Sequence, residues 1–329
     1  MNVFQGKGTV GSENFKIFSA QSSFMKDHFI PFSSIFKKTF WVDLYSLKKF
    51  IFIVSIMTVP HILLLAIYYP KPIPYQFATI NDILGFILII FSYLLVWIPY
   101  LIFITSSMIT EEISRGTMLI LVSKPVSKIK MVISKFLAIF IYFSVINILS
   151  LGIISIYVVL KQPFYDMIPF FLSQLIYPFV LLYFFGAFTM GLTMALKKTK
   201  SALLIPIIII LFMFLSVFMI KPALFQPCIF NKDLTYYEAF QIYHFDLGYH
   251  IMNVYQGILE LFFPEISQSM QIFLSSWGVY KRDLSDPFGL TFLKNNYYTP
   301  LASLILLMSV STMIFIIGFL IFKKKDITS

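Results

Sequence analysis

Long apolar runs dominate the chain, and six of them contain no aspartate, glutamate, lysine or arginine. Each is long enough to cross the hydrocarbon core of a bilayer, which takes about 20 helical residues. The runs are Phe50–Tyr69, Leu84–Met108, Phe136–Leu160, Met167–Leu196, Ala202–Ile220 and Leu301–Phe322. They do not alternate with polar positions, which excludes the strands of a membrane barrel. We therefore predict an all-α membrane protein with six transmembrane helices.

Four of the runs contain an internal proline, at Pro60, Pro99, Pro178 and Pro206. Membrane helices tolerate proline because neighbouring groups satisfy the carbonyl oxygen that the ring leaves without its usual donor. We expect the helices to continue through these positions, with kinks.

A helical pattern precedes the first run. Apolar residues recur there every three or four positions, at Phe36, Phe40, Leu44, Leu47 and Ile51. Most of the nearby lysines lie between them, so we predict an amphipathic helix over residues 34–49 in the cytoplasmic interface, with Trp41 at headgroup depth. The alternative is a cytoplasmic extension of the first span. Residues 1–33 are rich in Ser, Gly, Asn and Lys and are expected to be mobile.

The segment between the fifth and sixth runs, residues 221–300, is long and mixed in polarity. Its apolar residues follow a helical spacing over Phe240, Tyr243, Leu247, Ile251, Val254, Ile258 and Leu261. Gly248 and Gly257 argue against one unbroken helix. We predict an external cap of one or two amphipathic helices between spans five and six. Spans one to five then occupy residues 50–220, and residues 301–329 form the sixth span and a tail.

Lysine and arginine set the orientation. With the N-terminus inside, 18 of the 25 lysines and arginines fall on the cytoplasmic side. The reversed orientation would oppose the positive-inside bias. Both termini are therefore predicted to be cytoplasmic, in a multi-pass protein of the plasma membrane. Cys228 would then lie outside, within reach of a membrane-impermeant maleimide if its thiol is accessible.

Composition supports the membrane assignment. The chain is 59% hydrophobic and 12% charged, whereas soluble domains carry about 25% charged residues. The net charge of +10 does not indicate a nucleic-acid partner. The basic residues flank the apolar runs and form no dense stripe with interleaved aromatic residues. The single cysteine excludes an intramolecular disulfide.

The predicted spans offer little chemistry. His61 is their only side chain that titrates readily near neutral pH, whereas ion-coupled carriers normally place ionisable groups inside the membrane. An intramembrane hydrolase would need an acidic residue beside a serine and a histidine, and the predicted spans contain no acidic residue. His244 and His250 would diverge on a helix, and residues 6–9 lack the full spacing of a phosphate-binding loop. We predict no catalytic, cofactor or metal site in the chain.

The loop between the second and third spans, residues 109–135, carries the most specific motif. It reads ITEEISRGTMLILVSKPVSKIKMVISK and fits the pattern E-x-x-x-G-T-x-x-x-L-x-x-x-P-x-S-K. The matching positions are Glu112, Gly116, Thr117, Leu121, Pro125, Ser127 and Lys128, and Leu119 belongs with Leu121 to a leucine-rich turn. This resembles the intracellular coupling segment of type-2 ABC (ATP-binding-cassette) transporter permeases, in which arginine is commoner at the position of Lys128.

The resemblance implies a permease subunit, most simply of an exporter, driven by a separate cassette ATPase subunit that binds ATP and Mg. It also implies a second permease copy, identical or related, in the same lipid membrane. Ala187, Gly191 and Ala195 form a small-residue stripe suited to close helix packing, within one permease or between two. The alternatives are a secondary carrier or channel, an intramembrane enzyme, and a membrane scaffold without transport.

The residues of the loop suit a rigid lever. Gly116 permits a helix end or a close backbone approach. The stretch 117–122 is apolar, which is hard to explain in a cytoplasmic loop unless it docks on protein. Pro125 can begin the next helix, and Ser123 or Ser127 could cap it.

Gly116→Val tests this interpretation. A β-branched side chain resists positive φ and blocks close backbone approach. We expect the variant to insert at the normal level and to lose transport, measured as substrate efflux per unit of membrane-inserted protein. Normal efflux by well-expressed variant protein would contradict the lever.

Overall fold

The computed structural model of the chain describes residues 32–68, 85, 88–114, 127–161, 167–196, 198–230, 234–263, 266–283 and 291–324. The predicted mobile N-terminus lies almost entirely outside these residues. So does the middle of the predicted coupling loop, from 115 to 126.

The prediction of six membrane-spanning helices is confirmed. In chain order the spans comprise α2 (Leu47–Tyr68), η2 (Leu88–Trp97) with α4 (Ile98–Ser114), α6 (Lys128–Lys161), α7 (Met167–Leu196), α8 (Thr199–Leu215) with η3 (Ser216–Ile220) and α9 (Lys221–Leu224), and α13 (Pro300–Lys324). The first half of span two and the end of span five are wound as π-helix. Pro60, Pro178 and Pro206 lie inside their helices, as predicted.

Two helices extend past the predicted apolar runs and include a lysine that is buried in the fold. Span three begins at Lys128 rather than at Phe136, because its first turns extend past the apolar run and bury the stem of Lys135 against span two. Span five begins at Thr199 and continues to Leu224. It therefore includes Lys221, whose ammonium is buried in an ion pair. Helical geometry persists wherever the backbone is hydrogen-bonded, whereas an apolar run ends at the first charged residue.

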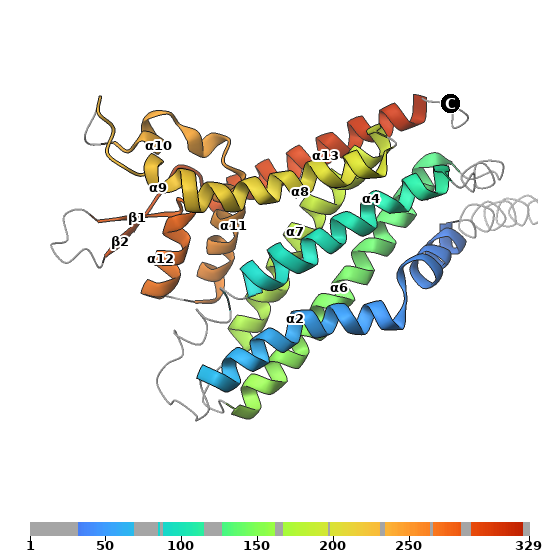
Figure 1. The fold of residues 1–329 in the computed structure, drawn as a ribbon, viewed down its shortest axis with the longest axis horizontal. Helices are drawn as coiled ribbons and strands as arrows, with labels where there is room; N and C mark the ends of the chain where they lie inside the picture. Colours follow the sequence, from blue (N-terminus) through green and yellow to red (C-terminus); the bar gives the residue numbers. More distant parts are fainter. Residues whose placement is uncertain are drawn as a thin grey trace, which may run out of the picture.

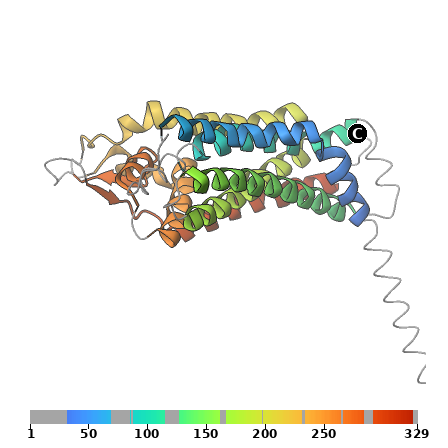
Figure 2. The same cartoon turned by 90° about the horizontal axis from the view of Figure 1, so that it is seen from below.

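Span four is the centre of the bundle. Helix α7 packs against α13, α4, α6 and α8, and α2 packs against α6 and η2 on the other side of the molecule. The views along two perpendicular directions show the helices side by side, with both described chain ends at one end of the bundle (Figures 1 and 2). Helices α8 and α13 present long rows of exposed apolar side chains, as expected of surfaces that face lipid or another membrane protein.

The chain before span one is helical but shorter than predicted. Residues 32–38 are helical and continue into η1 (Thr39–Leu44). Tyr45 is extended, with φ −76° and ψ 107°, and α2 begins at Leu47. The segment is thus not a straight extension of span one, and Leu47 and Ile51 belong to α2, where they are exposed. Its place in the membrane interface stays a prediction.

The chain between spans five and six forms a small subdomain at the opposite end of the bundle (Figure 1). We call its described residues, 225–230, 234–263, 266–283 and 291–299, the cap. It contains α10 (Tyr236–Ala239), η4 (Ile242–His244), α11 (Leu247–Phe262), α12 (Gln268–Ser276) and the antiparallel strands β1 (Tyr280–Arg282) and β2 (Phe292–Lys294). The two strands, of three residues each, were not predicted, and the rest of the regular structure in the described residues is helical, as predicted.

The predicted helical periodicity from Phe240 onward is correct only from Leu247. Gln241 has a positive φ of 53°, and Asp246 is extended and caps α11 by accepting the N–H of Tyr249 at 3.2 Å. The apolar residues before this cap therefore lie on a turn and a short 3-10 helix. Gly248 and Gly257 do not break α11. They allow Trp277 and Pro300 to approach its backbone closely.

Cys228 cannot report the orientation by its own reactivity, because its side chain is only 2% exposed. A better probe replaces Cys228 by Ser and adds Phe230→Cys, at a position that is 88% exposed in the cap. Lys200→Cys at the other end of the bundle is the matched control. We expect impermeant maleimide to label Phe230→Cys in intact cells and Lys200→Cys only after permeabilisation. The reverse pattern would overturn the predicted orientation.

Candidate coupling site

The predicted coupling residues are held between two described helix ends. Glu112 lies in the last turns of α4, and Ser127 and Lys128 lie at the start of α6. Gly116, Thr117, Leu119, Leu121 and Pro125 lie outside the described residues. The structure therefore shows how the segment is anchored.

Ser127 caps α6. Its Oγ accepts the backbone N–H of Lys130 at 3.4 Å, and its carbonyl oxygen accepts the N–H of Met131 at 3.2 Å. The helix predicted to begin at Pro125, which Ser123 or Ser127 was predicted to cap, lies at a position outside the described residues, so the cap at Ser127 does not test that prediction. The helix that Ser127 begins is span three itself. A displacement of the segment at Ser127 would thus act directly on a membrane-spanning helix.

Two polar contacts join the end of α4 to its neighbours. Lys135 of α6 is 1% exposed and donates from Nζ to the carbonyl oxygen of Met108 at 3.2 Å. A buried ammonium is costly without acceptors, so this contact fixes the two helices relative to one another. Thr199 at the start of α8 donates from Oγ1 to Oγ1 of Thr110 at 2.6 Å. Spans two, three and five are thereby connected near the segment.

An apolar cluster fills the space beneath these contacts, and we call it the junction cluster. It brings together the N-terminal segment and α4, α6, α7 and α13. Its buried members are Ile35, Ile109, Met131, Val132, Met190, Met194 and Phe322. The N-terminal segment is also held by Ser134, whose hydroxyl donates to the carbonyl oxygen of Phe32 at 3.2 Å.

Lys128 contacts the end of span six. Its Nζ donates to the carbonyl oxygen of Lys323 at 3.4 Å and lies 5.8 Å from the centroid of the Phe322 ring. A cation near the last carbonyl groups of a helix is favourable because of the helix dipole. In this chain, the lysine at the position of the family's arginine thus binds within the same subunit.

The small-residue stripe on α7 meets span six. A Cβ placed on Gly191 would lie 2.5 Å from the carbonyl oxygen of Ile314, and one on Gly318 would overlap the backbone of Gly191. The two helices therefore cross with their backbones in contact, as small residues permit in membranes. Ala187 is buried and Ala195 half-buried along the same helix. Gly318 was missed in the sequence, although it is the only glycine of its apolar run.

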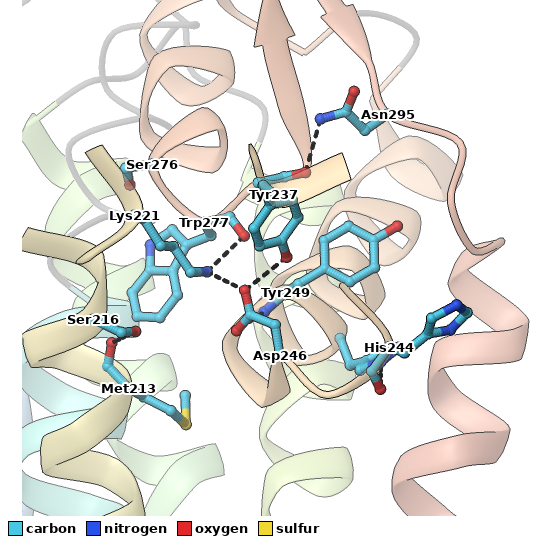
Figure 3. Close-up of polar contacts among 12 residues, drawn as sticks. Met213, Ser216, Lys221, Tyr237, His244, Asp246, Tyr249, Ser276, Trp277 and Asn295 are labelled. Atoms are coloured by element: carbon cyan, nitrogen blue, oxygen red, sulfur yellow. Dashed lines mark hydrogen bonds and ion pairs between the residues drawn. The ribbon is translucent and has the colours of Figure 1, made fainter. Parts of the chain in front are cut away.

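A second polar network joins span five to the cap (Figure 3). Lys221 is 3% exposed, and its Nζ lies 2.5 Å from Oδ2 of Asp246 and 2.9 Å from the carbonyl oxygen of Trp277. Tyr237 donates its hydroxyl to the same Oδ2 at 2.7 Å. No sequence pattern predicts the pair of Lys221 and Asp246, because the two residues are brought together only by the folding of the cap.

Helix α11 is bonded to spans six and four. Ser303 of α13 contacts Nδ1 of His250 at 3.0 Å and accepts from Nδ2 of Asn253 at 2.9 Å. Gln174 of α7 donates to the hydroxyl of Tyr255 at 2.7 Å. Burial lowers the pKa of His250. His244 instead contacts the Tyr298 hydroxyl at 2.6 Å, so the two imidazoles have different partners.

The fold defines a multi-pass α-helical membrane protein, in which the ends of α4 and α6 hold the segment between spans two and three. The sequence matches the family model described as ABC-2 family transporter protein over residues 5–327. The chain therefore belongs to this family. It is the membrane component of an ABC transporter and not itself the ATPase, and the family implies an ABC ATPase as partner. Comparison with curated proteins gives no significant match.

The crossing of α7 and α13 predicts opposite effects for two glycine substitutions. Gly191→Ala adds a methyl group against backbone and should lower the free energy of unfolding by about 1–3 kcal/mol. Gly152→Ala is the matched control, because a Cβ on Gly152 meets nothing within 4 Å. Alanine there should be neutral or stabilise the helix by about 0.5–1 kcal/mol. Thermal unfolding of both purified variants measures the difference, and equal midpoints would contradict the close crossing.

Proposed function

We propose that the chain is the permease subunit of an ABC exporter, coupled to a separate cassette ATPase through residues 109–135. ATP and Mg bind to that partner, and two permease copies, identical or related, pair with two ATPase subunits. The protein lies in the plasma membrane with both termini in the cytoplasm. Family membership supports the ATPase partner, and the anchoring of the segment is the observation that supports its role.

Rigid support on both sides of the segment favours force transmission. Span two ends in the Lys135–Met108 and Thr110–Thr199 contacts, and span three begins at the Ser127 cap. The junction cluster packs both against spans four and six. A push on the segment would therefore displace several helices as one body, because close-packed interiors transmit strain.

Contacts along span six connect the two ends of the bundle. Lys128 binds near its last turn, Gly318 crosses α7 in its last third, and Ser303 is bonded to the cap in its first turn. This continuity supports a concerted movement of span six and the cap during transport. A hollow of about 420 Å³ on its outer face, lined by Met308, Thr312 and Ile316 among others, would be covered by lipid or by the second copy.

The distribution of charge supports the orientation. Among the described residues, the end of the bundle that carries the segment holds Lys37, Lys38, Lys48, Lys49, Lys128, Lys130, Lys198, Lys200, Lys323 and Lys324. The cap end holds fewer basic residues, and several of them are paired with acids. The positive-inside bias therefore favours the segment on the cytoplasmic side.

The proposal predicts that the apolar stretch of the segment binds the ATPase. Replacing Leu119 and Leu121 together by Asp should release the ATPase from the tagged permease in mild detergent, while the six spans still insert. Moderate salt should leave the wild-type complex intact, because screening weakens charge contacts and not apolar ones. Recovery of ATPase per permease, on a stained gel, is the measurement.

The control variant replaces Ile229 and Leu234, two exposed apolar residues of the cap, by Asp. It carries the same added charge at the far end of the bundle and should retain the ATPase. If no ATPase co-purifies or cross-links to the segment, while purified permease alone moves solute down an ion gradient, the exporter assignment is wrong and a secondary carrier replaces it.

A further inference from the structure

A cavity of about 520 Å³ lies in the cap, between α10, α12 and the hairpin β1–β2. Its volume is within the range of about 300–1,000 Å³ that is usual for small-molecule sites. Two adjacent residues of α10 point to different sites: Tyr237 donates to Asp246 in the network with Lys221, and Glu238 lines the cavity. The aromatic part of the lining consists of Phe225, Tyr280, Phe292 and Tyr297.

A carboxylate is built into the cavity wall. Oε2 of Glu238 accepts both the backbone N–H and the hydroxyl of Thr235, each at 3.0 Å. Its Oε1 accepts the hydroxyl of Tyr297 at 2.8 Å. Burial opposes ionisation of this carboxyl group, but these hydrogen bonds and Lys281 outweigh it and lower the pKa of Glu238. The wall therefore carries a fixed negative charge at neutral pH.

The cation beside this carboxylate comes from the rim. Nζ of Lys281 lies 3.2 Å from Oε1 of Glu238, yet the lysine side chain is 51% exposed and that of the glutamate 11%. An ion pair whose lysine is half-exposed contributes little to stability. Lys281 can thus leave at little cost, and its ammonium occupies the position that a ligand ammonium would take.

A second acceptor in the lining has no partner. Asn295 is 5% exposed, and its Nδ2 donates to the carbonyl oxygen of Gly278 at 2.9 Å. Its Oδ1 is buried and has no hydrogen-bond partner among the described residues. An unmade hydrogen bond at a buried acceptor is costly. A donor in the cavity would reach this oxygen only if the Asn295 side chain turned toward it.

We propose that this cavity binds a small organic amine, a protonated ammonium group joined to an aromatic or aliphatic body. The ammonium takes the place of Lys281 at Glu238, and the aromatic lining holds the organic body. An anionic ligand would be repelled by the carboxylate of Glu238 in the wall. The basic residues Lys281 and Arg282 would attract it only weakly, because both are exposed to solvent. The site is independent of the coupling segment.

Calorimetric titration of the purified full chain in lipid nanodiscs tests the proposal. Phenethylamine should bind saturably, whereas phenylpropionate, with the same body and a carboxylate, should not. Glu238→Gln keeps the cap of α10 and should weaken binding at least about tenfold, through loss of a charge-assisted contact. Lys281→Ala removes the competing ammonium and should tighten binding about twofold to fivefold.

The pair Glu260 and Lys294 supplies matched controls, because it is a second Glu–Lys ion pair of the cap, at 2.8 Å, outside the cavity lining. Glu260→Gln and Lys294→Ala should leave the affinity for phenethylamine unchanged. No saturable binding of phenethylamine to the wild-type chain would overturn the proposal. Weaker binding of phenethylamine by Lys281→Ala would also overturn it. Because Lys281 is exposed, this variant should fold, and it still tests the proposal if Glu238→Gln fails to fold.

Discussion

Backbone contact between α7 and α13 is the constraint on which the arrangement of the bundle depends. Gly191 and Gly318 have no side chains, so the two helices approach more closely than any larger residue would allow. Helix α7 in turn packs against spans two, three and five. Because α13 reaches from the cap to the junction cluster, the crossing positions the two functional ends of the molecule relative to one another.

The six spans could be predicted from the sequence, because a continuous apolar run long enough to cross lipid has few other solutions. Their ends could not be predicted as well. Lys135 and Lys221 lie inside membrane-spanning helices but outside the apolar runs that predict them. Each ammonium is tolerated there because it finds acceptors in the folded chain, and these acceptors cannot be predicted from the run itself. The strands β1 and β2 are short and half-exposed, and their sequence carries no alternation long enough to predict them.

The motif of the candidate coupling site could be predicted from the sequence, but the contacts that anchor it in the fold could not. Its residues follow one another in the chain, so a pattern detects them. The frame that holds them joins residues far apart in sequence, such as Thr110 with Thr199 and Lys128 with Phe322. The same holds for the cap cavity, where Glu238 of α10, Lys281 of β1 and Asn295 after β2 meet only in the folded cap. Such contacts between distant residues cannot be predicted from composition or from the spacing of residues along the chain.

The burial of Lys221 has a consequence for the order of biogenesis. This lysine is synthesised before Asp246 and Trp277, so span five enters the bilayer while its ammonium has no protein partner. Until both later residues have emerged and folded, the charge must stay hydrated at the membrane surface. Span five can therefore settle at its final depth only after the cap has formed. Assembly of the transporter then waits on a small folded region that contributes no span of its own.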